Sequence, residues 1–334
     1  MVTIKDIARE LGISTSTVSR ALSDSPLVRE DTKRQILRVA RRLGYQRNEL
    51  ARALVKGTSG AVGLLVPDIT NPFFSDIARG VAEIADKTGA GVLLCNTDGR
   101  ADHELDYVSL MRRKRVDGLL LCSATIEAPY LEELMLARIP FILVSRLTGR
   151  ADVSYVITDD TAGARLAVEH LVKLGHRDIG FIGGPEDVQA SRDRMSAYRA
   201  VLRHRGLEVT PAWATFAGFT QAAGRKAARE MLSQHRHPSA IFAANDVTAL
   251  GVLEVAEELG LTVPGKLSIV GYDDISYASL PRIQLTTVAQ PAVEMGRIAV
   301  SWLFDALENP HVERLQKVLA PRLVVRSTTA PASR

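Results

Sequence analysis

The sequence predicts a small all-α segment followed by an α/β body of two doubly wound parallel-sheet sub-domains. Apolar residues recur at helical spacing through the first 57 residues. From Ala61 onward, apolar runs of strand length alternate with helical stretches. The charge is also divided, with a net +6 over residues 1–57 and −2 over the remainder of the 334-residue chain. A basic segment beside a near-neutral body indicates that the N-terminus contacts a polyanion.

The composition is that of an ordinary globular protein, 46% hydrophobic and 24% charged. The longest apolar runs are shorter than a membrane span requires. The N-terminal stretch MVTIKDIARE is charged at once and has no signal-peptide core. Cys95 and Cys122 each lie at the end of an apolar run, so we expect buried, reduced thiols rather than a disulfide. These features predict a cytoplasmic protein.

The first 22 residues predict two short helices joined by a tight turn. Thr3 can cap the first helix, Gly12 can end it with a positive φ, and Ser14 can cap the second. The apolar residues expected on the inner faces are Ile4, Ile7, Ala8, Leu11, Val18, Ala21 and Leu22. This is the helix-turn-helix arrangement, whose second helix enters the DNA major groove.

The second helix begins with a cluster of hydroxyl side chains in GISTSTVSRAL (12–22). Short polar side chains let the backbone approach DNA, and we expect Thr15 and Ser16 at base edges and Arg20 at guanine. The residues expected as cap or phosphate contacts are Ser14, Thr17 and Ser19. The alternative is a capped amphipathic helix without a ligand. The paired helix, the glycine and the basic charge favour DNA.

A third helix is expected to begin within 28–32, where two acids suit the helix dipole, and to close at Gly44. The residues spaced for burial are Ile36, Leu37, Ala40 and Leu43. Asn48 can cap a brief helix through Leu54, followed by a flexible joint over 57–60. So short a helix needs a partner to form. The predicted DNA-contacting set is Thr3, Ser14, Thr15, Ser16, Thr17, Ser19, Arg20, Arg29, Asn48, Ala51 and Leu54.

The body is predicted from its continuous apolar strands joined by helices, which imply parallel sheets covered on both faces. The candidate strands are 61–68, 91–97, 118–124, 141–146, 155–160, 178–184, 240–246, 268–274, 285–291 and 322–328. The candidate helices include 76–87, 161–174 and 292–307. A break near Asp159 divides the strands into two sets. Ligands bind beyond the carboxyl ends of such strands, so two sheets with facing ends enclose a cleft.

From its motifs the chain resembles the lactose/galactose repressor family, whose body shares the fold of periplasmic sugar-binding proteins. TIKDIARELGISTSTVSRAL is similar to the family's headpiece and NELARAL to its hinge helix. PDITNPFF (67–74), GHRDIGFIGGP (175–185), NDVTALG (245–251), VPGKLSIVGYDD (263–274) and LTTVAQP (285–291) follow its body in order. The resemblance implies that Leu54 of paired hinge helices inserts at the operator centre and bends the DNA.

The resemblance also implies the domain boundaries. The headpiece would span 1–46, the hinge and linker 47–60 and the effector-binding and dimerisation domain 61–334. The chain would cross between sub-domains near Asp159, Gln290 and Ala320. The N-sub-domain would then be 61–158 plus 291–319, and the C-sub-domain 159–290 plus 320–330. The family's tetramer uses a C-terminal leucine heptad, which this chain lacks before its end at STTAPASR, so we expect a homodimer.

The effector pocket is expected from polar residues after the strands and from the resemblance. A carboxylate at Asp273 can accept two sugar hydroxyls, and Asn245 can both donate and accept. Arg194 matches the family's effector-contacting arginine. The predicted set is Phe73, Phe74, Ser145, Asp159, Arg194, Phe219, Asn245 and Asp273. It favours a sugar or sugar acid.

Each pocket residue has a structural alternative. Asp273 would otherwise cap a helix, Arg194 would lie in solvent, with Arg192 as its competitor, and Phe219 would pack in the core. One of Phe73 and Phe74 is expected to stack on the ligand and the other to pack inside, and Asp246 is expected to cap the next helix. The residues Val188 and Ala190 stand where purine-binding members carry an Arg and a Thr, which disfavours a purine.

The function predicted is a DNA-binding transcriptional regulator, a repressor, controlled by a small effector. The alternatives are a sugar-binding protein for transport, an activator with a nucleobase or other metabolite effector, and an enzyme. The sequence carries no GxGxxG after a strand, no GxSxG and no His/Cys cluster, so neither catalysis, a metal nor a cofactor is predicted. Its five central histidines are expected to be structural or exposed.

Overall fold

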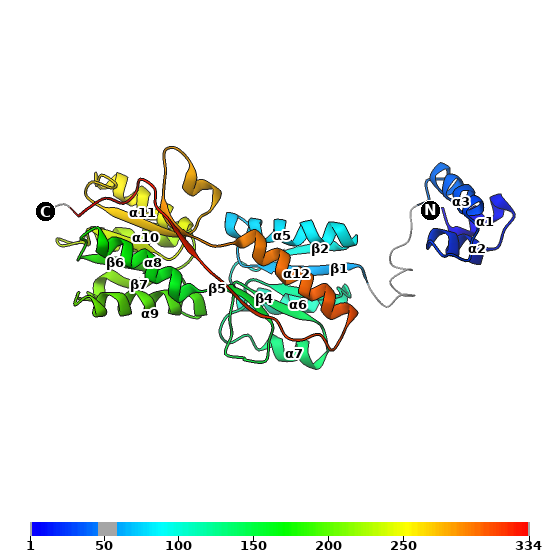
Figure 1. The fold of residues 1–334 in the computed structure, drawn as a ribbon, viewed down its shortest axis with the longest axis horizontal. Helices are drawn as coiled ribbons and strands as arrows, with labels where there is room; N and C mark the ends of the chain where they lie inside the picture. The colour runs from blue at the N-terminus through cyan, green and yellow to red at the C-terminus, as the bar shows by residue number, and fades with distance from the viewer. Residues whose placement is uncertain (1, 46–58, 333–334) are drawn as a thin grey trace. The chain divides into compact units, whose positions relative to one another are not determined.

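The computed structural model describes residues 2–45 and 59–332. The chain divides into two compact units, Met1–Ser59 and Gly60–Arg334, and each is described by itself (Figure 1). The predicted fold class is confirmed, with a helical first unit and an α/β second unit built on two sheets. No helix in the described ranges is long and apolar enough to cross a membrane.

The first unit contains three helices, α1 (Ile4–Leu11), α2 (Thr15–Leu22) and α3 (Glu30–Arg42). The capping residues predicted from the sequence lie at the ends of these helices. Thr3 forms a capping box with Asp6, Gly12 ends α1 at φ 66°, and the Ser14 hydroxyl accepts a hydrogen bond from the Thr17 amide. The buried residues shared by the three helices are Ile7, Ala8, Val18, Ala21, Ile36, Val39 and Ala40.

The prediction that Leu37 is buried is wrong. Its side chain is 36% exposed, whereas Val39 is buried. The reason is helical phase: Ile36, Val39 and Ala40 lie at i, i+3 and i+4 and share one face, while Leu37 is turned about 100° away from Ile36.

The first sheet of the body has the strand order β11-β5-β4-β3-β1-β2, and all its pairs are parallel. Its strands are β1 (Ala61–Val66), β2 (Gly91–Asn96), β3 (Gly118–Leu121), β4 (Phe141–Val144), β5 (Tyr155–Thr158) and β11 (Gln316–Leu319). Helices α5 (Pro72–Thr88) and α12 (Ala292–Glu308) cover one face. Helices α6 (Ala101–Arg113) and α7 (Tyr130–Leu136) cover the other.

The second sheet has the order β12-β10-β9-β8-β6-β7, parallel except for the antiparallel pair of β12 with β10. Its strands are β6 (Ile179–Gly183), β7 (Ala214–Phe216), β8 (Ala240–Ala243), β9 (Ser268–Asp273), β10 (Thr286–Ala289) and β12 (Arg322–Val324). Helices α8 (Asp160–Lys173) and α9 (Gln189–His204) pack on one face. Helices α10 (Gln221–Leu232) and α11 (Asp246–Glu258) pack on the other, and 3-10 turns η1 (Pro211–Trp213) and η2 (Ser276–Ser279) complete the unit.

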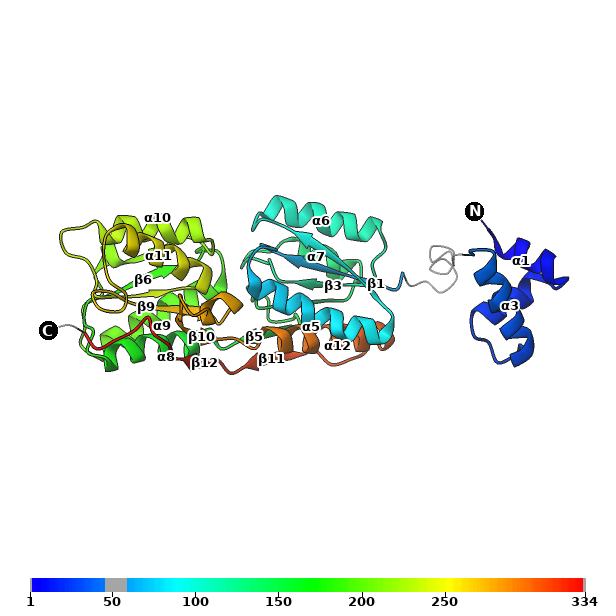
Figure 2. The same ribbon diagram turned by 90° about the horizontal axis from the view of Figure 1, so that it is seen from above.

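The chain passes between the two sheets three times. It leaves β5 into α8, leaves β10 into α12, and leaves β11 into β12. The three passages run along one side of the body (Figure 2). They therefore join two sub-domains that each consist of segments distant in sequence.

Two strands were not predicted, β7 and β11. The three residues of β7 are only half-buried, and three of the four residues of β11 are exposed. Both strands lie at a sheet edge, where burial on two faces no longer imposes a continuous apolar run. Helix α5 also begins four residues before its predicted start, because Asn71 caps it and Pro72 occupies its first position.

Candidate DNA-contact helix and effector cavity

Helix α2 presents its hydroxyl cluster at its N-terminal end. Thr15, Ser16, Ser19 and Arg20 are exposed on it. The Ser14 hydroxyl lies 2.9 Å from that of Ser16 and 2.8 Å from that of Thr17. The cap is therefore part of a local hydroxyl network, and the exposed side chains remain accessible to a ligand outside the unit.

The basic residues of the first unit differ in their pairing. Among the described residues, Arg9 pairs with Asp6 and Arg34 with Asp31, whereas no ion pair joins Arg20 to any of them. A long exposed cation without a carboxylate partner suits contact with a nucleic acid. Exposed Arg29 precedes α3.

Of the remaining predicted DNA contacts, one already has a hydrogen-bond partner within the unit and three lie outside the described residues. The Thr3 hydroxyl donates to the Asp6 carboxylate at 2.7 Å, so its role in the structure is that of a cap. The predictions for Asn48, Ala51 and Leu54 fall outside the described residues.

Seven of the eight predicted effector residues line one cavity between the two sub-domains. The full lining is Asn71, Phe73, Phe74, Ser145, Arg146, Arg194, Phe219, Asn245, Asp273 and Gln290. The first five come from loops and a helix start after β1 and β4, and the others from the facing sub-domain. The cavity volume is about 20 Å³, room for roughly one water molecule. Phe73, Asp273 and Gln290 also line an adjoining opening of about 310 Å³, so the narrow cavity lies beside a wider one.

Arg194 is a buried side chain fixed by three groups. It is 3% exposed, and its Nε and Nη2 lie 2.8 and 2.7 Å from one carboxylate oxygen of Asp160. Its guanidinium also donates to the Ala244 carbonyl and lies 3.7 Å from the centroid of the Tyr272 ring. Burial acts to lower the pKa of Arg194, but Asp160 raises it above its ordinary value. A permanent cation is thus held in a fixed orientation at the cavity, whereas Arg192 donates to a backbone carbonyl at the surface.

Asp273 is the last residue of β9 and has φ 115°. Its carboxylate accepts a 2.7 Å hydrogen bond from Gln290 and caps no helix. Burial raises the pKa of Asp273 to about 7, against the opposing effects of Arg194 and the Gln290 hydrogen bond. The carboxylate therefore changes its charge near neutral pH.

Asn245, rather than Asp246, caps α11, so the expectation for Asp246 is wrong. The Asn245 oxygen accepts from the Thr248 amide at 2.8 Å, and its side-chain nitrogen donates to the Phe219 carbonyl at 3.1 Å. Asp246 is fully buried and accepts hydrogen bonds from the Ile275 amide and the Thr287 hydroxyl. The cap position falls on the last non-helical residue, which is one residue earlier than expected.

The aromatic residues enclose a cation. Phe73 and Phe74 meet edge to face at 5.2 Å, and both are buried in the core while lining the cavity. The Arg146 guanidinium lies 5.7 Å from the Phe74 centroid and 5.8 Å from that of Phe219. Since Phe74 and Phe219 belong to opposite sub-domains, Arg146 bridges them through its charge on two ring faces.

The structure corrects the expectation for Asp159 and adds residues to the cavity. Asp159 does not line it; its carboxylate caps α8 by accepting from the Ala162 amide at 2.8 Å. The neighbouring Asp160 holds Arg194 instead. The lining residues outside the predicted effector set are Asn71, Arg146 and Gln290. Each directly follows a strand or its loop, so position alone was the available signal.

A second contact joins the sub-domains outside the cavity. The Ile126 amide donates 2.9 Å to the carbonyl of Asp187, which connects the loop after β3 to the loop after β6. Beneath the first loop, Glu104 is buried, and burial raises the pKa of its carboxyl. The two sub-domains are thus joined by backbone as well as side-chain contacts.

Comparison with known proteins gives two family matches. The model for bacterial regulatory proteins of the lacI family matches residues 3–48, and that for a periplasmic binding protein-like domain matches residues 168–329. The ribose operon repressor of Halalkalibacterium halodurans is 35% identical over 98% of this chain and 97% of its own length.

Two solved structures extend these similarities. A lacI-family transcriptional regulator from Enterococcus faecium with bound ribose shares 32% identity and a TM-score of 0.73 over 82% of this chain and all of its own. The lac repressor dimer bound to operator and an anti-inducer shares 26% identity and a TM-score of 0.88 over 98% of this chain and 99% of its own.

Proposed function

The chain belongs to the lacI family of bacterial regulatory proteins, and from this we propose that it represses transcription under the control of a sugar bound between its sub-domains. It is a DNA-binding regulator, and two copies would present their headpieces to a pseudo-palindromic operator. We also propose 1–46 as the headpiece, 47–60 as the hinge that carries Asn48, Ala51 and Leu54, and 61–334 as the effector domain.

The observation that supports a sugar is the mixture of side chains around one cavity. Asp273 accepts hydroxyls, Asn71 and Gln290 both donate and accept, and Arg194 is a fixed donor. Phe73, Phe74 and Phe219 offer apolar surface for the faces of a sugar ring. A relative represses a ribose operon by name and a solved relative contains ribose. We therefore propose a monosaccharide, with D-ribose as the first candidate.

A sugar acid is the second candidate, because of Arg146. This side chain is 5% exposed and forms no ion pair within the described part of the chain, and its Nε lacks a hydrogen-bond partner there. Burial lowers the pKa of Arg146. A carboxylate on the ligand would offset the cost of burying this cation.

The proposed mechanism links cleft closure to the operator. A sugar that replaces the contacts across the cleft alters the relative position of the two sub-domains. In a dimer this moves the segments that lead to the headpieces. A coupling free energy of about 1–3 kcal/mol between sugar and operator is sufficient.

The test is fluorescence anisotropy of the full chain on DNA from upstream of its own gene, titrated with D-ribose, D-ribonate and a nucleobase. We expect salt-sensitive binding that ribose or ribonate changes and the nucleobase does not. The Arg20→Ala variant is the matched control, since it should lose operator affinity and keep sugar affinity. Absence of specific DNA binding together with turnover of a bound sugar would contradict the proposal.

A further inference from the structure

The strand end at the cavity carries two consecutive acids with different contacts. Asp273 has φ 115° and Asp274 has φ 60°, both in the region that side chains other than glycine rarely adopt. Such a backbone persists only where surrounding contacts fix it. In the described chain, three consecutive residues receive those contacts from three different elements.

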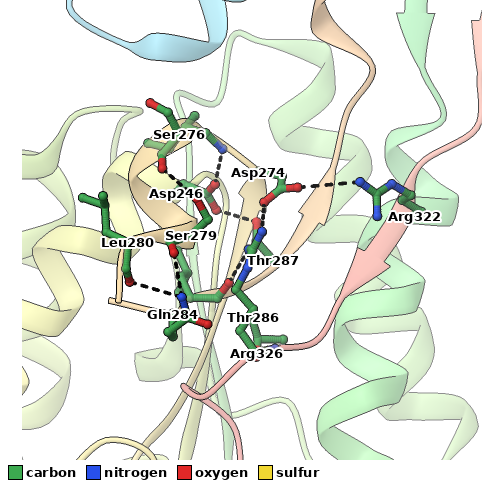
Figure 3. Close-up of polar contacts among 12 residues, drawn as sticks. Asp246, Asp274, Ser276, Ser279, Leu280, Gln284, Thr286, Thr287, Arg322 and Arg326 are labelled. Atoms are coloured by element: carbon green, nitrogen blue, oxygen red, sulfur yellow. Dashed lines mark hydrogen bonds and ion pairs between the residues drawn. The ribbon is translucent and has the colours of Figure 1, made fainter. Parts of the chain in front are cut away.

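The first contact is the Gln290 bond to Asp273 described above, which comes from the residue after β10. The second holds Asp274, whose carboxylate accepts a 2.6 Å hydrogen bond from Arg326. The third holds Ile275, whose amide donates 2.8 Å to buried Asp246 at the start of α11. Figure 3 shows the contacts of Asp246 and Asp274 with the surrounding residues.

The Asp274 contacts lead to the last passage between sub-domains. Its second oxygen lies 3.9 Å from Arg322, the first residue of β12, which directly follows that passage. Arg322 stands opposite Ala289, the last residue of β10, in the antiparallel pair. Arg326 also donates to the Leu285 carbonyl at 2.8 Å just before β10. Both ends of β10 therefore contact the segment 322–326, whose arginines also contact Asp274.

The Asp274–Arg326 pair is largely shielded from water. The side chains are 17% and 14% exposed, whereas Arg322 is 74% exposed. Removing one member of a shielded pair leaves a charge without its partner and costs more than loss of an exposed pair. The ion pair with Arg326 therefore contributes most to holding Asp274 in place. The contact with Arg322 is weaker because solvent screens it.

We infer that Asp274 is a positioning residue for the sugar site. Its ion pair with Arg326 holds the Asp273 carboxylate in place and connects it to the segment 322–326, which follows the third passage between the sub-domains. Asp274 lies outside the small cavity of Arg194 and Phe219, but it lines the adjoining, wider opening together with Asp273 and Gln290. The inference rests on the proposed function, because it assumes that Asp273 contacts a sugar.

The experiment compares Asp274→Asn, Arg326→Gln and the double variant by calorimetric titration with D-ribose. Asparagine keeps the size and the tolerance for positive φ but removes the charge. We expect each single variant to bind ribose about 10-fold more weakly and the double variant to lose no more than either single one. Arg322→Gln should weaken binding only about 2-fold, as an exposed contact.

The matched control is Asp178→Asn, which removes an exposed pair with Arg236 at 2.9 Å outside the cavity lining. It should leave ribose affinity unchanged. Affinity within 2-fold of the native chain for Asp274→Asn, or additive losses in the double variant, would overturn the inference, since both exclude action through Arg326.

A ligand-free readout separates this inference from the proposed function. Amide hydrogen exchange over 273–275 and 286–290 should rise equally in Asp274→Asn and Arg326→Gln, with no further rise in the double variant. If the native chain binds neither ribose nor ribonate, the proposed effector is wrong and hydrogen exchange decides this inference. Unchanged exchange in the single variants would then overturn it.

Discussion

Gln290 donates a 2.7 Å hydrogen bond to the carboxylate of Asp273, which joins the ends of two neighbouring parallel strands at the cavity. The donor is an amide and the acceptor is a carboxylate whose pKa burial raises to about 7. The strength of this contact therefore depends on pH in the neutral range. A ligand that bonds to this carboxylate would therefore bind with an affinity that depends on pH.

We expect ribose affinity to rise with pH through a midpoint near 7, because the ionised Asp273 accepts hydroxyl hydrogen bonds more strongly than the protonated form. The groups that face it are Arg194, Gln290, Asp160, Arg146 and buried Asp246. Calorimetric titration from about pH 6 to pH 8 measures the profile.

Asp273→Asn should bind weakly and show no such midpoint, and a midpoint that persists in this variant would assign the titration to another group. The contribution of Asp273 to folding stability changes with pH in the opposite direction to ribose affinity. The folded pKa lies above the unfolded value, so Asp273 contributes stability at low pH that is lost as pH rises from about 4 to about 7.

Asp160→Asn tests whether Arg194 needs its counter-charge. The pair is 12% and 4% exposed, so removing the carboxylate leaves a buried cation without its partner, at a cost of about 3 kcal/mol in the free energy of unfolding. Sugar affinity should fall at least 10-fold as the guanidinium loses its orientation. Urea unfolding and calorimetry measure the two effects. Arg192→Gln, which changes a surface arginine two residues away, should alter neither; an equal loss there would show that the helix as a whole is responsible.

Arg20→Ala should remove one base contact of the headpiece. The side chain is exposed one turn into α2 and carries no ion pair with the described residues. A bidentate contact to guanine contributes about 1–3 kcal/mol of discrimination, so both operator affinity and base preference should fall. Anisotropy on single-base operator variants measures this. Arg34→Ala, on α3 and paired with Asp31, should lower affinity for all sequences alike or not at all.

Gly296→Ala should destabilise the first sub-domain. A Cβ at Gly296 would overlap the Ile77 carbonyl, and one at Gly80 would overlap that of Val293, so α5 and α12 approach through these glycines. Overpacking of this kind costs about 1–3 kcal/mol, measured by urea unfolding. Gly149→Ala is the control, since its nearest neighbour is a carbonyl oxygen at 4.0 Å. Equal midpoints for the two variants would mean that the helices separate without cost.

The sequence predicted most of this architecture because its signals are local. Central strands buried on both faces are continuous apolar runs, and caps such as Ser14 and Gly12 mark helix ends. The edge strands β7 and β11 lack that burial and gave no signal. Leu37 was misplaced because apolar character alone does not fix helical phase.

The cavity was predicted less completely, for a related reason. Position after a strand selected Asp273 and Asn245, and the family resemblance selected Arg194. Position alone did not separate Asp159 from Asp160, since adjacent residues point in different directions and only tertiary packing decides which faces Arg194. Arg146 and Gln290 were left out of the predicted set because their partners are distant in sequence.

Two histidines connect the C-terminal segment to the second sub-domain. Their titration makes the stability of this sub-domain depend on pH. The His176 ring nitrogens lie 2.9 Å from the Ser239 hydroxyl and 3.1 Å from the Ala330 carbonyl, and His170 lies 3.0 Å from the Thr329 hydroxyl. Burial lowers the pKa of both histidines. The folded chain therefore binds these protons less readily than the unfolded chain, whose histidines titrate near pH 6.5.

The contribution of the two histidines to stability should consequently be complete above about pH 6.5 and decline as pH falls below it, by about 1.4 kcal/mol for each unit by which a pKa is lowered, against the opposite contribution of Asp273. Urea midpoints from about pH 5 to pH 8 measure this. His176→Gln should lower the midpoint at neutral pH and flatten its decline, because glutamine retains hydrogen bonding and does not titrate. His204→Gln, an exposed histidine at the end of α9, is the control and should keep the native profile. An equal pH dependence in His176→Gln and the native chain, or an equal change in His204→Gln, would show that the buried histidines make no such contribution.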